Sequence, residues 1–271
     1  MTAREFLTNL SIILAMMAIA ALLETGVPLF AARHGQRDRR TANLGLTVCV
    51  FLLNWLLSSI AAVLALSLRP AGLMSVLAVP RVMQIVIGVV AIDFSSAYLS
   101  HRLLHVIPAL WKFHRVHHSD AFVDVTTTYR THPIETVWRT LFVILPVWVL
   151  GIPATSVVVQ RLLQAANGVL GHANISLWAP LDRALSLVWV TPNVHKVHHS
   201  RELAETNSNY GVILSIYDRL LGTFTPSDRA RSVVYGLNDA EQLAAGSLPS
   251  LLATPFDVSD TNVRIQRSAA R

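Results

Sequence analysis

Ten of the eleven histidines in this 271-residue chain lie between His101 and His199, and most of them fall into three short clusters. The clusters read HRLLH (residues 101–105), HRVHH (114–118) and HKVHH (195–199). Residues three and four apart share one face of a helix, with Cβ atoms about 5–6 Å apart, and adjacent residues point about 100° apart. An HxxHH cluster can therefore reach two metal ions. Because a buried group of unpaired imidazoles would be costly, we predict metal binding by His101, His105, His114, His117, His118, His195, His198 and His199.

Two isolated histidines and three other polar residues are further candidates. His172, in GHANI, is predicted as a ligand, with Asn174 as a hydrogen-bond partner of a ligand. His132, in THPIE, precedes a proline, which disfavours helix at that position. It either binds metal or hydrogen-bonds a ligand, and Glu135 could do the latter. Asp93 lies in an apolar stretch, where an ionisable side chain indicates function, so it either supports the ligands or hydrogen-bonds a neighbouring helix.

The donor set limits the choice of metal. Imidazole ligation suits zinc, copper, iron or nickel. A mononuclear zinc site takes three or four protein ligands, so eight to ten histidines indicate two metal ions. The sequence has no HExxH motif and therefore lacks the helix-borne base of zinc proteases. The single cysteine, Cys49, excludes a cysteine-based zinc site and an internal disulfide.

The composition indicates that lipid surrounds much of the chain. Hydrophobic residues make up 53% and charged residues only 14%, and the mean hydropathy is +0.49, whereas a typical soluble domain carries about 25% charge. The net charge of +6 is almost wholly arginine, since Lys112 and Lys196 are the only lysines. No nucleic-acid-binding module accompanies this charge, so we expect a membrane protein without a nucleic-acid partner.

Three apolar stretches are long enough to cross the roughly 30 Å of hydrocarbon in a bilayer. They cover Leu7–Phe30, Leu44–Leu68 and Val82–Tyr98. The alternative for the first is a signal peptide, although its apolar pattern continues past any plausible cleavage point. The loop RHGQRDRR (33–40) carries four arginines, and short arginine-rich loops stay in the cytoplasm. The third span should therefore deliver the histidines to the cytoplasmic side.

Two shorter apolar stretches, Val137–Leu150 and Thr155–Leu170, are separated by a Gly-Ile-Pro sequence that ends helices. We predict a helical hairpin that dips into the membrane and returns, followed by an interfacial helix within Leu177–Val190. The predicted fold is an all-α integral membrane helical bundle, with about three full spans plus the hairpin, and a cytosolic helical cap that carries the histidines. The expected divisions are N-terminal spans (1–81), a histidine-box domain (82–225) and a polar C-terminal tail (226–271).

An ordered set of motifs resembles one known superfamily. Asp93 precedes HRLLH by seven intervening residues, and LWKFHRVHHS, HPIE, HKVHHS, NSNYG and YDRLLGT follow in that order. This set is similar to the fatty acid hydroxylase / sterol desaturase superfamily over roughly Val82 to Thr225, about half of the chain. The resemblance implies an integral membrane protein with a cytosol-facing di-iron centre, which uses dioxygen and two electrons to hydroxylate or desaturate a lipid C–H bond.

The resemblance also implies roles for individual residues. The histidines of the three clusters would bind two iron ions, and His172 matches the isolated histidine that follows the membrane hairpin in relatives. Some members carry a further histidine four residues later, where this chain has Ser176. The ligand set departs from theirs at this position, and His132 could compensate.

The implied reaction needs a lipid from the membrane and an external electron donor, a ferredoxin or a b-type cytochrome with its reductase. The sequence itself shows no dinucleotide fingerprint and no cysteine set for an iron–sulfur cluster. Zinc could substitute for iron on the same ligands. Two alternatives stay open, a membrane zinc-dependent hydrolase and a non-enzymatic metal-binding or transport protein. Scarce lysine with abundant arginine and alanine favours a GC-rich bacterium, and so a multi-pass protein of the inner membrane with its active site facing the cytoplasm.

Overall fold

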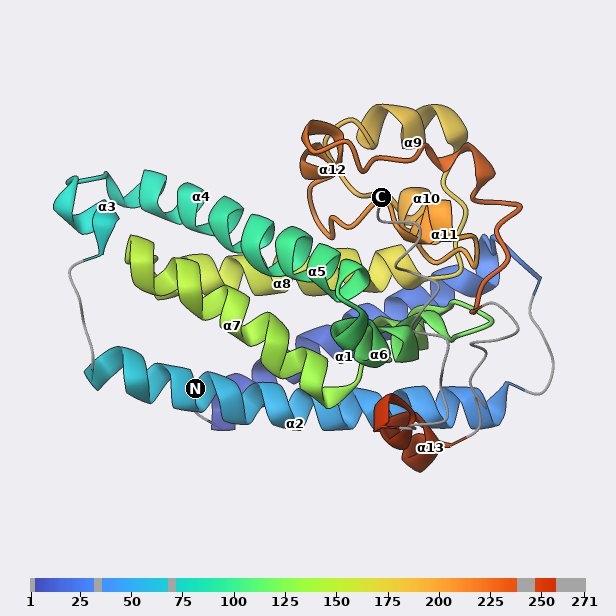
Figure 1. The fold of residues 1–271 in the computed structure, drawn as a ribbon, viewed down its shortest axis with the longest axis horizontal. Helices are drawn as coiled ribbons and strands as arrows, with labels where there is room; N and C mark the ends of the chain where they lie inside the picture. Colours follow the sequence, from blue (N-terminus) through green and yellow to red (C-terminus); the bar gives the residue numbers. More distant parts are fainter. Residues whose placement is uncertain (1–2, 32–35, 68–71, 238–246, 257–271) are drawn as a thin grey trace.

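The computed structural model describes residues 3–31, 36–67, 72–237 and 247–256. Within these ranges the chain is helical, with isolated bridges and no strand, which confirms the predicted all-α class. Five long helices lie side by side, and the short helices that carry most of the histidines gather at one end of them (Figure 1). The long helices are α1 (Ala3–Gly26), α2 (Arg37–Ser67), α4 (Arg81–Ile92), α7 (Pro133–Leu150) and α8 (Ala154–His172).

Shorter helices and single turns complete the fold. The 3-10 helix η2 (Val125–Tyr129) belongs to the loop that follows α6. The short α-helices are α3 (Leu73–Val76), α5 (Ser100–Val106), α6 (Pro108–His118), α9 (Ala179–Leu185), α10 (Pro192–His198), α11 (Leu203–Thr206), α12 (Ile216–Leu220) and α13 (Leu248–Ala253).

Four helical segments are long and apolar enough to cross a membrane, judged by length and composition. The three predicted spans are confirmed as helices with shifted ends, and the fourth segment is the first arm of the predicted hairpin. Large apolar side chains face outward on them, and Leu22, Val82 and Leu141 are 71%, 72% and 54% exposed. Extended apolar surfaces of this kind mark contact with a membrane, so the chain is a multi-pass membrane protein. The four segments are Arg4–Gly26, Arg37–Ile60, Arg81–Val106 and Pro133–Leu150.

The third span runs unbroken through α4, η1 and α5, and η1 (Asp93–Leu99) is a π-helical turn. Hydroxyl groups satisfy carbonyls along this turn. Ser96 Oγ donates to the carbonyl of Ile92 at 2.8 Å, and Ser100 Oγ donates to the carbonyl of Ser96. A π turn closes its hydrogen bond over five residues and not four. The additional residue sets the direction in which the histidines of α5 point.

Helices α7 and α8 form the predicted hairpin. α7 ends where Gly151 adopts a φ of +69°, a left-handed conformation that suits glycine. The chain before α3 crosses this apex so closely that a Cβ atom on Gly72 would lie 2.2 Å from the Cα atom of Gly151. Helix α4 packs against both arms of the hairpin. The hairpin is therefore fixed to the third span along its length.

The segment expected to be a polar tail is partly packed into the protein. Ala230, Val233 and Tyr235 are buried together with Val123 and Val197. Helix α13 packs against α2 near the histidine-bearing end. Residues 238–246 and 257–271 of this segment lie outside the described ranges.

Candidate metal centre

Nine histidines lie in two adjacent buried groups at one end of the helix bundle. Within each group, one ligand atom from every residue lies within 4.8 Å of the others. Adjacent histidines of HRVHH belong to different groups, and so do those of HKVHH, as the 100° offset between neighbouring helical residues predicts. The first group contains His101, His105, His114, His118 and His198, and the second contains His117, His172, His195 and His199.

Three short helices and the end of α8 supply these imidazoles. Helix α5 carries His101 and His105 one turn apart, α6 carries the HRVHH histidines, and α10 with its cap residue His199 carries the HKVHH histidines. A proline in the first turn of α6 and of α10 fixes where each helix begins. His172 is the last residue of α8, and Lys196 of α10 donates to its carbonyl at 2.5 Å. The hairpin thus returns the chain to the site.

The ring tautomers of the second group indicate a cation between facing histidines. Nδ1 of His172 donates to the carbonyl of Gly168 at 2.7 Å, which leaves a lone pair on its Nε2. That Nε2 lies 3.0 Å from Nε2 of His117, whose Nδ1 donates to the carbonyl of Arg130 at 3.3 Å. Two lone pairs at this distance repel each other unless a cation lies between them. Metal–imidazole bonds of about 2.0–2.1 Å place neighbouring ligand nitrogens about 3.0–3.4 Å apart, so the spacing fits a shared ion.

The first group shows the same arrangement. The Nε2 atoms of His101 and His114 are 3.0 Å apart, and their Nδ1 atoms bond the carbonyl of Tyr210 and the carboxylate of Glu135. His118 is buried, and within the described residues neither of its ring nitrogens is hydrogen-bonded. A buried polar group without a partner costs about 1–3 kcal/mol, and metal coordination would remove this cost. The ring nitrogens of the two groups could therefore bind two metal ions, one in each group.

Burial favours the neutral form of several of these imidazoles, which is the form that binds metal. It lowers the pKa of His172 to about 3, with the nearby Lys196 adding to the effect, and it lowers the pKa of His198 to about 3. Burial also lowers the pKa values of His117 and His118 well below their ordinary range. At neutral pH these four imidazoles therefore present lone pairs without first losing a proton.

Glu135 is a buried carboxylate that holds one of the histidines. One of its oxygens accepts from Nδ1 of His114 at 2.9 Å, and the other accepts from Nε of Arg139 at 2.7 Å. A carboxylate behind a ligating imidazole fixes the orientation of the ring and raises its basicity. The contact between Glu135 and a histidine is the kind expected from the sequence. Arg139 was not among the predicted residues, although its spacing of four from Glu135 on one helix is a signal for this pairing.

The NSNYG segment (207–211) holds two histidines of the first group through its backbone. The carbonyls of Ser208 and Tyr210 accept from Nδ1 of His198 and His101, both at 2.7 Å. Asp218 fixes the segment in turn, because its carboxylate accepts from the backbone N–H groups of Tyr210 and of the glycine that follows, both at 2.8 Å. The acceptors are main-chain carbonyls, so the residue types of this segment do not predict the contacts.

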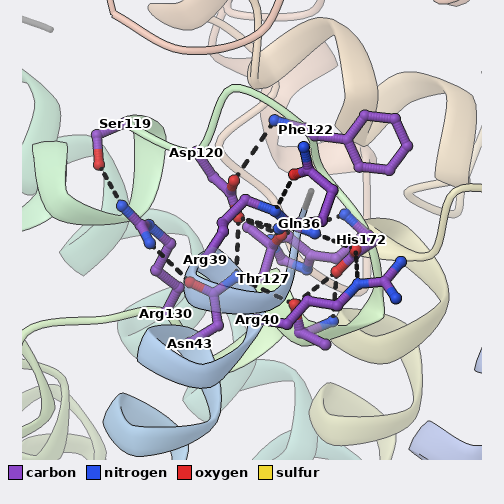
Figure 2. A network of polar contacts seen from close by, with 12 residues as sticks. Gln36, Arg39, Arg40, Asn43, Ser119, Asp120, Phe122, Thr127, Arg130 and His172 are labelled. Carbon is purple, nitrogen blue, oxygen red and sulfur yellow. Dashed lines mark hydrogen bonds and ion pairs between the residues drawn. The ribbon is translucent and has the colours of Figure 1, made fainter. Parts of the chain in front are cut away.

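A buried polar network fastens the loop after α6 to α2 (Figure 2). Arg39 of α2 pairs with Asp120 at 2.8 Å and also with Asp124. Arg130 donates to Asn43 of α2 at 2.6 Å, and the carbonyl of the same arginine accepts from a histidine of the second group. The arginine-rich start of α2 therefore lies at the same end of the bundle as the histidines and helps to position them.

Three of the predicted residues lie apart from the two groups. His132 caps α7, since its Nδ1 accepts from the backbone N–H two residues later and its Nε2 bonds the carbonyl of Leu252, both at 3.2 Å. It belongs to neither group, because the proline after it starts α7 at this point and both ring nitrogens are engaged there. Asn174 bonds the backbone of Phe30, and Asp93 is buried in the π-helical turn. Within the described residues, no hydrogen bond joins either of them to a histidine.

A cavity of about 1470 Å³ adjoins the histidines and extends between α1, α2, α7 and α8. His117, His172 and His195 of the second group line it, together with apolar side chains of α7 such as Val143 and Val147. Ligand-binding cavities are mostly apolar with a few polar groups at defined places. This one combines apolar side chains of the membrane helices with histidines of the second group.

Comparison with known proteins gives consistent matches over the histidine-bearing region. The family model described as fatty acid hydroxylase matches residues 85–223. An ornithine lipid hydroxylase from Rhizobium tropici is 38% identical over 178 residues, which are 65% of this chain and 51% of that protein. Alkylglycerol monooxygenases from Caenorhabditis elegans and Xenopus tropicalis are 28% and 32% identical, over 52% and 54% of this chain and 27% and 31% of theirs. The matched region spans about half the length of the first relative and less than a third of the other two. No solved structure matches this chain.

Proposed function

Because this chain belongs to the fatty acid hydroxylase family, we propose that it hydroxylates a membrane lipid with dioxygen. The observation that carries the proposal is the pair of buried histidine groups beside a partly apolar cavity. The names of the relatives, a lipid hydroxylase and alkylglycerol monooxygenases, support hydroxylation as the class of reaction.

In this proposal each histidine group holds one iron ion. The two irons would supply the oxidising power that breaks an unactivated C–H bond. The chain's own part is to keep nine imidazoles in place, through Glu135, the NSNYG carbonyls and the end of α8. His132 has no place in this ligand set, because it caps α7.

The overall reaction converts a lipid C–H bond, dioxygen, two electrons and two protons into a C–OH group and one water molecule. The electrons come from an external carrier, a ferredoxin or a b-type cytochrome with its reductase. We place the site at the cytoplasmic face of a bacterial inner membrane, because the arginine-rich start of α2 lies beside it and such segments stay in the cytoplasm.

The alternative readings of the histidines fit the site less well. A zinc hydrolase needs a carboxylate base beside the metals. Glu135 is the carboxylate that contacts a histidine within the described residues, and both of its oxygens are engaged by His114 and Arg139. A transporter would hold its ligands near mid-span, whereas these ligands gather where the spans end.

The test is isotopic labelling of lipids in cells that express the chain under oxygen-18 gas. We expect one lipid class to gain one oxygen atom that carries the label, and the His198→Ala variant to lack this product while still inserting into the membrane. A product that has lost two hydrogens without gaining oxygen would show that the reaction is desaturation and not hydroxylation. An unchanged lipid profile in iron-replete cells with a reconstituted electron donor would refute both reactions.

A further inference from the structure

An arginine that has no ion-pair partner among the described residues lines the cavity beside the histidines. Arg161, on the hairpin helix α8, lines the cavity, and its one hydrogen bond within the described residues is donated to Oγ of Ser58 at 3.0 Å. None of the described carboxylates forms an ion pair with it. The other arginine on the hairpin wall, Arg139, differs because it is paired with Glu135 at 2.7 Å.

Polar side chains cluster around this arginine. Asn54 lies one turn before Ser58 on α2, Gln164 lies one turn after Arg161 on α8, and both line the same cavity. The wall also includes apolar side chains, such as Val143 on α7, and the charged residues Arg4 and Glu5 on α1. An arginine at membrane depth is costly, and such residues face a cavity and mark a binding path. A hydroxyl group alone leaves the positive charge of the guanidinium unbalanced.

We infer that Arg161 binds the anionic group of a lipid whose chain reaches the metal centre. The inference rests on the proposed function, because it treats the cavity as the place of the substrate. Guanidinium groups recognise carboxylates and phosphates through paired, charge-assisted hydrogen bonds. The ligand class is therefore a lipid with a carboxylate or a phosphate, with the amide and hydroxyl groups of Asn54, Ser58 and Gln164 available to its remaining oxygens.

The position of Arg161 also limits the part of the lipid that reacts. Arg161 and His172 are eleven residues apart on α8, which corresponds to about 16 Å along the helix axis. An extended hydrocarbon chain covers this distance with roughly a dozen carbon–carbon bonds. The carbon beside the histidines should therefore lie well away from the anionic group, and shorter chains should bind without reaching the metals.

Lipid binding to the purified, iron-loaded protein in detergent, kept without an electron donor, tests the inference without depending on catalysis. Native mass spectrometry would compare octadecanoic acid with octadecanol, and phosphatidic acid with diacylglycerol. We expect the wild type to prefer the charged member of at least one pair by roughly tenfold to a hundredfold, the effect of a charge-assisted hydrogen bond. The pair that shows the preference identifies carboxylate or phosphate as the anion.

Variants assign the preference to one residue. Arg161→Gln should abolish it, Arg161→Lys should keep part of it, and Arg183→Gln, which removes an exposed arginine outside the cavity, should leave it unchanged. Arg161→Met should also raise the melting temperature of the lipid-free protein, because it removes an unbalanced buried charge. Equal binding of charged and neutral lipids by the wild type, or a preference that survives in Arg161→Gln and Arg161→Met, would overturn the inference. If this binding pattern holds while no lipid gains oxygen-18, the proposed function fails and the anion site stands.

Discussion

The carboxylate of Glu135 determines which nitrogen of His114 faces the metal site. Nδ1 of His114 donates to it at 2.9 Å, so Nε2 points toward Nε2 of His101, 3.0 Å away. Arg139 holds the other carboxylate oxygen at 2.7 Å. One buried side chain thus sets both the tautomer and the direction of a ligand.

Replacing Glu135 by glutamine should weaken metal binding about 10- to 100-fold, the usual effect of losing a partner behind a ligating histidine. An amide offers one acceptor oxygen for two donors, so either His114 or Arg139 loses its bond. Competition with a chelator on purified protein measures the affinity. Thr140→Ser is the control, because its hydroxyl bonds only the backbone of α7 and serine keeps that bond. Wild-type affinity in Glu135→Gln would show that the carboxylate does not support the site.

Removing one ligand from each group should show that the two groups hold separate ions. We expect His105→Ala and His172→Ala each to lower the metal content by one ion per chain, measured by elemental analysis after iron-replete expression. His132→Ala should keep both ions and lose about 1 kcal/mol of stability, since it removes a helix cap. Loss of an ion in His132→Ala would contradict this prediction and show that His132 binds metal.

Metal removal should lower the thermal stability of the whole chain. The facing lone pairs and unpaired ring nitrogens of the metal-free state favour opening of the site, and a bound ion stabilises the folded form by mass action. At a free metal concentration a hundred times Kd, the gain is about 2.7 kcal/mol for one ion. A melting curve before and after chelation, and again after iron is restored, measures this shift. An unchanged melting temperature would mean that the imidazoles are satisfied without metal.

Arg39 and Arg40 are neighbours on α2, and their replacement should destabilise the protein to different extents. Arg39 is buried between Asp120 and Asp124, and its replacement by glutamine leaves the buried carboxylate of Asp120 without its ion-pair partner, a loss of about 3–5 kcal/mol. The side chain of Arg40 is 51% exposed and lies 3.4 Å from Asp124, so Arg40→Gln should cost about 0–1 kcal/mol. Unfolding in denaturant compares the two variants. Similar losses in both would contradict a specific role for the buried pair.

The sequence predicted the parts of this protein that depend on local periodicity. Apolar length located the spans and the hairpin, because a bilayer requires about 20 apolar residues per crossing. The spacing of three and four residues predicted that the clustered histidines share helix faces. The 100° offset between adjacent residues predicted that His117 and His118 point into different groups. Metal binding by these residues stays a prediction, as does the division of the chain at residue 225.

Features that depend on tertiary contacts were not visible in the sequence. The NSNYG carbonyls became acceptors only because the chain folds back onto α5 and α10. His132 shares its residue type with the ligands, yet its place before a proline makes it a cap. Asn174 follows His172 closely, but its amide bonds the backbone of Phe30, in the segment after the first span. In the sequence Arg161 only interrupts an apolar stretch, and its place in the wall of the cavity depends on the tertiary fold.

The π-helical turn at Asp93–Leu99 constrains how this protein could be adapted to bilayers of other thickness. Deleting one residue from α4, where the winding is α-helical, would rotate everything upstream by about 100° relative to His101 and His105. Residues could be inserted or deleted only in α4, upstream of the turn. Their number would have to correspond to whole helical turns, so that the two sides of the change keep the same relative rotation. The rotational phase of this span therefore couples the hydrophobic thickness that it can match to the assembly of the two histidine groups.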